Sequence, residues 1–265
     1  MSTEIKEKTI GGITKEDTIA FAVRIMLGNQ YNAIVHANEE KDIIVACLRL
    51  GWNDAFRHVT KNKDENMDKY VSNQLGYSEN YDSYIKKEIL RDRIVLDAFK
   101  EYVQATKTDD KVQVLTDRIS LNLLDKFSTV KMTTGDKRLC FGHLQKMFNI
   151  AIKMYLCVYM LREYIPLKEE IQEHWFESSE LVDCLQYADC PVDSIILDTL
   201  GSKVSKTDKE EGKKIKSITW SKIGTEPSKS VQDYIDVQRD MQKQLEKSKY
   251  KGCCNLKYDF LNWNN

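Results

Sequence analysis

Two short polar motifs, each followed by an apolar helical segment, contain the residues whose types and spacing could do chemistry. The first motif is Gly142-His-Leu-Gln-Lys146, and the apolar run Met147–Tyr164 follows it. The second is Cys190-Pro-Val-Asp193, which precedes the apolar segment Ile195–Leu200. A lysine at a glycine-led helix start and an aspartate after Pro-Val could supply the amine and the carboxylate of one site.

The chemistry open to this pair is nucleophilic attack by an amine. A lysine near the positive end of a helix dipole is expected to give up its proton more readily. The neutral Lys146 amine could then attack C1′ of a deoxyribose and form a Schiff base. Asp193 would take the amine proton and stabilise the cationic sugar. Enzymes that act on a base also hold it outside the duplex, and the candidate residues for that pocket are Gln145, Asn149 and Trp220.

Chain geometry allows the two motifs to meet. A helix over His143–Tyr164 would extend roughly 33 Å at about 1.5 Å per residue. It should end before Pro166, because proline disfavours a helical conformation in the residue that precedes it. The segment Lys168–Ala188 has nearly the same length, so an antiparallel return would bring Asp193 back to the level of Lys146.

Three polar residues form a stripe along the helix that follows Gly142. Gln145, Asn149 and Lys153 are spaced at i, i+4 and i+8, which places them on one face. Apolar residues cover most of the remaining circumference, and a helix of this kind is usually buried. We therefore expect the stripe to face a cleft or a partner; the alternative is a solvent-exposed face.

In these two motifs the chain resembles the helix-hairpin-helix DNA glycosylases. Members of that superfamily carry a glycine-rich hairpin that ends in Gly-x-x-x-Lys, and then Val-Asp or Pro-Val-Asp at the start of another helix. The resemblance implies Lys146 as nucleophile, Asp193 as general base, and an all-α fold that binds and bends DNA. The lysine-dependent 8-oxoguanine branch would be the nearest analogue. The family's Leu-Pro-Gly-x-Gly hairpin is absent from this chain, and Thr133–Asp136 is at best a degenerate substitute for it.

The expected activity is that of a DNA N-glycosylase and AP lyase in DNA repair, with no cofactor and no metal. His143 is a further candidate for contact with substrate, although a histidine near a helix start is more often a local hydrogen-bonding group. Trp220 could equally be a core residue. Amides at a helix start and nearby cations suit phosphate binding, and the candidates for the DNA backbone are Gly142, Lys131, Lys137 and Arg138.

Two other functions are open. The chain could be a non-catalytic helical module that binds a nucleotide or a protein partner through the polar stripe, for example in a phage–host conflict system. The spacing of Arg138 and His143 is also found in small helical ribonucleases that act as toxins. That third hypothesis requires the two side chains to converge, across a dimer if the protein forms one.

Helical periodicity dominates the elements that must position these residues, which predicts an all-α, multi-helix globular protein. Two helical subdomains, 1–127 and 128–265, are expected to flank a cleft, with both motifs in the second. The predicted helices outside the motif region are Lys15–Ala37, Glu39–Gly51, Tyr81–Thr106 (one long helix or two joined ones), Val112–Phe127, Glu169–Ala188 and Ser230–Lys249. The predicted loops are His58–Asp68, Ser128–Lys137 and the lysine-rich Ser202–Lys216, and Ile218–Ile223 is expected to be extended.

Composition narrows the class of protein. The chain has 265 residues, of which 42% are hydrophobic and 31% charged, and only three are proline, so a turn-rich β architecture is disfavoured. A net charge of −1 is lower than that of most dedicated nucleic-acid binders, although it can hide a basic face. Seven cysteines without a CxxC pair favour reduced thiols over a metal site. We expect a cytoplasmic protein that neither carries a secretion signal nor enters a membrane.

Overall fold

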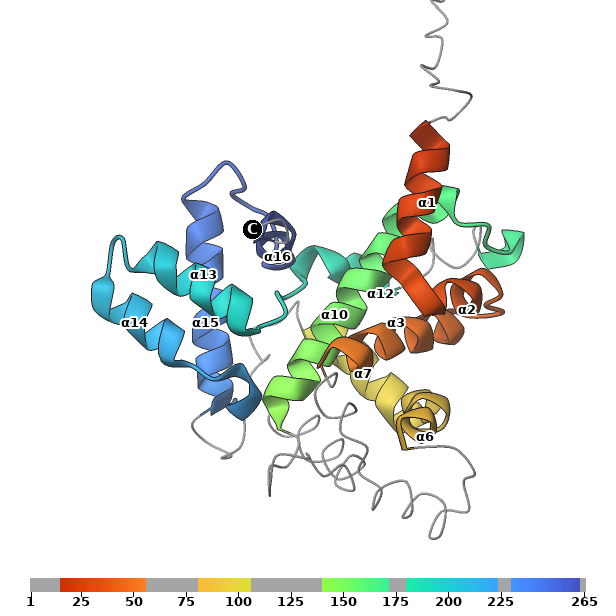
Figure 1. Cartoon of the computed structure of the whole chain (residues 1–265), viewed down its shortest axis with the longest axis horizontal. Helices are drawn as coiled ribbons and strands as arrows, with labels where there is room; N and C mark the ends of the chain where they lie inside the picture. Colours follow the sequence, from red (N-terminus) through yellow and green to blue (C-terminus); the bar gives the residue numbers. More distant parts are fainter. Residues whose placement is uncertain (1–14, 56–80, 106–139, 172–179, 224–229, 263–265) are drawn as a thin grey trace, which may run out of the picture.

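The computed structural model describes residues 15–55, 81–105, 140–171, 180–223 and 230–262. All regular structure in these ranges is helical, which confirms the predicted all-α class (Figure 1). No helix within the described residues is long and apolar enough to cross a membrane.

Helix α10 (Phe141–Met160) lies at the centre of the molecule, between the helices of the N-terminal half and those of the C-terminal half (Figure 1). It packs along α3 (Glu40–Ala55). The two backbones come into contact at Gly51, because a Cβ atom there would overlap the carbonyl group of Met147. The sequence predicted that a helix ends at Gly51. That prediction was wrong: α3 continues to Ala55, and the glycine serves close helix packing rather than helix termination.

The remaining helices of the N-terminal half cover α3 and α10. The described part of the predicted segment Tyr81–Thr106, residues 81–105, forms two helices joined by a 3-10 turn. Phe99 meets Phe148 of α10 edge-on, with 5.6 Å between ring centroids, and Trp52 of α3 is fully buried in the same core. The elements of this half are α1 (Lys15–Leu27), η1 (Gly28–Gln30), α2 (Tyr31–Val35), α6 (Tyr81–Lys87), η2 (Ile89–Arg91) and α7 (Arg93–Ala105).

The C-terminal half begins after α10 and contains the second motif. Helix α13 (Ser194–Val204) follows Asp193 directly, and α15 (Ser230–Glu246) is the predicted amphipathic helix. The predicted extended segment around Trp220 is instead a 3-10 turn, η7 (Trp220–Lys222), with extended residues on either side. The other elements are η4 (Arg162–Tyr164), α12 (Glu180–Cys184), η6 (Leu185–Tyr187), α14 (Lys209–Ser217) and α16 (Leu256–Asn262).

The lysine-rich segment Ser202–Lys216 is not a loop, contrary to the prediction. Helix α13 extends into it, and α14 starts after Asp208, whose side chain caps the helix by accepting the Glu211 N–H at 3.0 Å. Gly201 and Gly212 let α13 and α14 approach closely. The buried Ile215 anchors an otherwise charged helix to the core. The many charged residues of this segment wrongly indicated a loop, because Ile215 and the two glycines suffice to pack it as a helix.

Several predicted elements lie outside the described residues. These are the loop His58–Asp68, the helix Val112–Phe127, the connector Ser128–Lys137 with Thr133–Asp136, and the subdomain boundary between residues 127 and 128. Residues 172–179 of the predicted helix Glu169–Ala188 also fall outside, and its described C-terminal part forms α12 and η6.

Candidate functional site

Lys146 lies in the second turn of α10 and is only 7% exposed. Its Nζ is 3.6 Å from Oδ2 of Asp193 and 3.0 Å from Oδ2 of Asp54. The ring of Trp220 covers the same ammonium group, with 4.9 Å from Nζ to the ring centroid. The structure thus brings the two predicted residues together and adds a second carboxylate and an aromatic ring.

Asp193 is fixed in place by the helix that it precedes. It is the N-cap residue of α13, and its Oδ1 accepts the backbone N–H of Ile196 at 3.0 Å. A negative charge at this end of a helix is favoured by the unpaired N–H groups of the first turn. With Oδ1 used by the cap, Oδ2 is the oxygen that faces Lys146.

Gln145, one residue before the lysine, joins the two motifs through hydrogen bonds. Its Oε1 accepts the N–H of Val192 at 3.1 Å, and its Nε2 donates to the carbonyl of Val192 at 2.8 Å. Nε2 also donates to the carbonyl of Gly142 at 2.9 Å. The side chain is fully buried. Gln145 was predicted to hold an extruded base; in this structure its amide instead fixes the backbone that precedes Asp193.

Asn149, one turn further along α10, is likewise buried and engaged within the protein. Its Oδ1 accepts the hydroxyl of Tyr102 at 2.9 Å, and its Nδ2 donates to the hydroxyl of Tyr234 at 3.0 Å. The Tyr234 hydroxyl in turn donates to Oδ2 of Asp189 at 2.9 Å. A base-binding role for Asn149 would require these bonds to be exchanged.

The stripe ends at Lys153, whose Nζ is 2.7 Å from Oδ2 of Asp259 on α16. Burial raises the pKa of the Asp259 carboxyl, and the lysine opposes that shift. All three stripe residues are therefore buried and bonded to the C-terminal half of the same chain, and Asn149 also to Tyr102 of the N-terminal half. The alternative of a solvent-exposed face was wrong, and the partner that the stripe contacts is internal.

Trp220 reaches Lys146 because Gly142 permits a close backbone contact. A Cβ atom at Gly142 would overlap the carbonyl oxygen of Trp220, and the Gly142 N–H donates to the carbonyl of Ile223 at 2.8 Å. The first turn of α10 is thereby joined to η7. Gly142 was predicted to contact the DNA backbone, but in this structure its N–H is used within the protein.

His143 is packed beneath Trp220, with 5.3 Å between the ring centroids. It is almost fully buried, and its Nδ1 is 3.2 Å from Sγ of Cys140. Burial, with a smaller contribution from the nearby Lys146 charge, lowers the pKa of His143 to about 4. The imidazole is therefore neutral near pH 7, which fits a local packing and hydrogen-bonding role better than contact with a phosphate.

Asp54 is the site residue that the sequence analysis missed. It lies in the last turn of α3, three residues after Gly51, and its side chain is 41% exposed. The close contact between Gly51 and Met147 places it beside the turn of α10 that carries Lys146. The only available signal was Gly51, because a glycine within an apolar helix can mark close packing against another helix. No pattern in the sequence indicated that α10 is that other helix.

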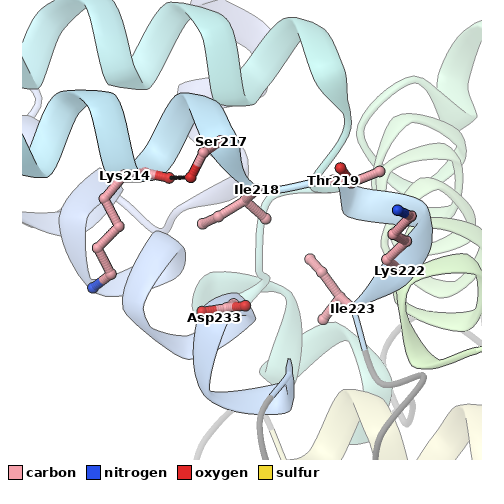
Figure 2. A pocket seen from close by; sticks show the side chains of 7 residues that line it. All are labelled: Lys214, Ser217, Ile218, Thr219, Lys222, Ile223 and Asp233. Carbon is pink, nitrogen blue, oxygen red and sulfur yellow. Dashed lines mark hydrogen bonds between the residues drawn. The ribbon is translucent and has the colours of Figure 1, made fainter.

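A separate depression lies on the surface of the C-terminal half, between the end of α14, η7 and α15 (Figure 2). Its volume is about 280 Å³, and neither Lys146 nor Asp193 lines it. Figure 2 shows Asp233 and Ile218 facing the hollow, with Lys214 and Lys222 at its edges. The mixture of charges gives it no clear preference for an anion or a cation.

The predicted DNA-backbone residues Lys131, Lys137 and Arg138 lie outside the described residues. Because the ribonuclease hypothesis pairs Arg138 with His143, the structure does not test that pair. Among the residues that the structure does describe, no three His, Cys, Asp or Glu side chains are grouped to hold a metal ion. No protein-family model, curated protein or solved structure matches the chain.

Proposed function

We propose that the protein is a lysine-dependent DNA glycosylase and lyase that removes a modified base through a Schiff-base intermediate. The observation that carries this proposal is the Lys146 amine, 3.6 Å from a carboxylate that is fixed at the start of α13. A helical lysine followed by an N-capping aspartate is the arrangement that the resemblance to helix-hairpin-helix glycosylases implies for the nucleophile and its acidic partner.

The reaction would begin when the ammonium group of Lys146 loses a proton to a carboxylate. The free amine attacks C1′ of the extruded nucleotide, and the glycosidic bond breaks with its electron pair going to the base. The sugar carries positive charge as that bond breaks. A carboxylate held at Asp193 stabilises this cation, because it is preorganised and partly shielded from water.

Trp220 is the residue best placed to contact a base in this reaction. Its indole ring lies over the Lys146 ammonium and remains partly exposed. Stacking of a base on an aromatic side chain contributes about 1–3 kcal/mol and tolerates different bases. Gln145 and Asn149 would support the reaction indirectly, because their side chains hydrogen-bond to the backbone of the Cys-Pro-Val-Asp motif.

Borohydride trapping tests the proposal directly, because borohydride reduces a Schiff base to a stable amine. Duplexes that carry 8-oxoguanine, other modified bases or an abasic site would be incubated with the protein and borohydride, and the adduct measured by denaturing gel. Wild-type protein should form an adduct. Lys146→Gln should form none, whereas Lys213→Gln, an exposed lysine on α14, should behave as wild type.

Absence of an adduct with every duplex would refute the lyase mechanism. The alternative of a non-catalytic binding module makes the opposite prediction. In that case the affinity for the nucleotide or protein ligand would be unchanged by Lys146→Gln and Asp193→Asn, and no variant would form an adduct.

A further inference from the structure

We infer that Asp54 is a second catalytic carboxylate, which accepts the proton of the Lys146 ammonium so that Asp193 keeps its negative charge. The inference rests on the proposed function and deepens it. It assigns different tasks to two aspartates that contact the same amine from different helices.

The geometry favours Asp54 as the proton acceptor. Its Oδ2 is 3.0 Å from Nζ, within hydrogen-bond distance, whereas the Asp193 oxygen is 3.6 Å away. The Asp54 side chain is 41% exposed and that of Asp193 is 25% exposed. Asp54 is therefore the nearer and the less buried acceptor, while Asp193 has one oxygen bonded to the cap of α13.

Charge conservation explains why one carboxylate is insufficient. If Asp193 were the only acid, it would become neutral on accepting the lysine proton, and no negative charge would then face the cationic sugar. With Asp54 present, the cluster of one ammonium and two carboxylates carries the same net charge before and after the transfer. Asp54 holds the proton until the sugar ring opens, and the carboxylate at the α13 N-terminus remains ionised.

Each of the three protons of the Lys146 ammonium group can be followed through the reaction. The first goes to Asp54, which frees the amine to bond to C1′ while the base leaves. The second goes from the new secondary ammonium to the departing base. Ring opening then breaks the C1′–O4′ bond; the nitrogen lone pair forms the iminium bond, and O4′ takes the proton that Asp54 had held. The third proton stays on the iminium nitrogen, and Asp54 is again ionised.

The other charged groups around the site do not compete for this task. His143 shares α10 with the lysine and is neutral near pH 7 because it is buried. The Lys153–Asp259 ion pair is two turns further along α10, and its two members are bonded to each other. Among the residues that the structure describes, Asp54 from α3 and Asp193 from the start of α13 are the two carboxylates in contact with Nζ.

The test is the rate of single-turnover adduct formation with borohydride, measured from pH 6 to pH 9. Asp54→Asn should lower the rate at pH 7 by about 100-fold, in line with the loss of a general base. Its rate should then rise with pH, because hydroxide replaces the missing carboxylate, while the wild-type rate changes much less. Asp54→Ala should be partly rescued by added formate, which a structural role would not predict. Asp198→Asn, on the exposed face of α13, is the matched control.

The outcomes separate this inference from the proposed function. If wild type forms an adduct and Asp54→Asn reacts within about threefold of it with the same pH profile, Asp54 is not the proton acceptor and the glycosylase proposal stands. If Asp54→Asn fails to fold, the formate series on Asp54→Ala decides: rescue supports the inference, and its absence in a folded protein overturns it. If wild type forms no adduct, both proposals fail.

Discussion

Replacement of Gln145 by leucine should destabilise the protein by about 2–5 kcal/mol, because the glutamine amide is the hydrogen-bond partner of a buried backbone segment. The substitution keeps the side-chain size but removes the bonds to the N–H and the carbonyl of Val192. Both groups belong to a fully buried residue. A buried polar group left without a partner costs about 1–3 kcal/mol, so two such groups cost about 2–6 kcal/mol. The apolar leucine offsets part of that cost.

Urea denaturation followed by circular dichroism would measure this loss. Gln186→Leu is the matched control, since Gln186 is exposed and donates only to a nearby carbonyl; its effect should be below about 0.5 kcal/mol. A loss of less than about 1 kcal/mol for Gln145→Leu would show that Val192 finds other partners, and the reasoning that Gln145 fixes the second motif would then be wrong. Under the proposed function, Gln145→Leu should also slow adduct formation, because the position of Asp193 depends on Val192.

Three further predictions concern the surroundings of the site. The imidazole of His143 takes up a proton near pH 6.5 in the unfolded chain and only near pH 4 in the folded one. The free energy of unfolding should therefore fall by about 3 kcal/mol as the pH drops from 6.5 to 4. In urea titrations at several pH values, His143→Gln should not show this part of the pH dependence. Lys153→Met should lower the free energy of unfolding, measured with urea, by about 3–5 kcal/mol, because Asp259 is left buried without its cation. The double variant Lys153→Met, Asp259→Leu should regain most of that stability. Equal losses in the two proteins would refute a buried pair. Gly142→Ala should displace η7, because the added methyl group overlaps the Trp220 carbonyl. The tryptophan fluorescence spectrum should then shift to longer wavelength. An unchanged spectrum would contradict the close contact.

The sequence was sufficient to predict the helical class and the convergence of Lys146 with Asp193. Periodic apolar residues mark helices wherever one face is buried, and helix lengths bound where a returning chain can arrive. The path of that return was not tested, since residues 172–179 lie outside the described ranges. The predicted site roles of Lys146, Asp193 and the residues around them also remain predictions.

The features that the sequence did not reveal are long-range contacts between helices. The polar stripe of α10 could be recognised, but its partners Tyr102, Val192 and Tyr234 come from three separate segments. Gln145 and Asn149 were therefore assigned to a substrate, although they complete internal bonds. Asp54 was missed for the same reason. A carboxylate near a helix end looks like any solvated residue until the packing of α3 against α10 is known.

Helix α10 is attached to its two sides by different kinds of contact, and this has a mechanical consequence. Towards the second motif it is held by hydrogen bonds to Val192, which have fixed direction and length. Towards α3 it is held mainly by apolar side chains and the Gly51 contact, which tolerate small sliding movements. Under the proposed function, a bound DNA that displaces α3 along α10 would act on the contact that can slide, while the hydrogen bonds to Val192 hold. The distance from Lys146 to Asp54 would then change while the distance to Asp193 stayed constant, so that bending of the bound DNA would act on proton transfer and leave the nucleophile aligned.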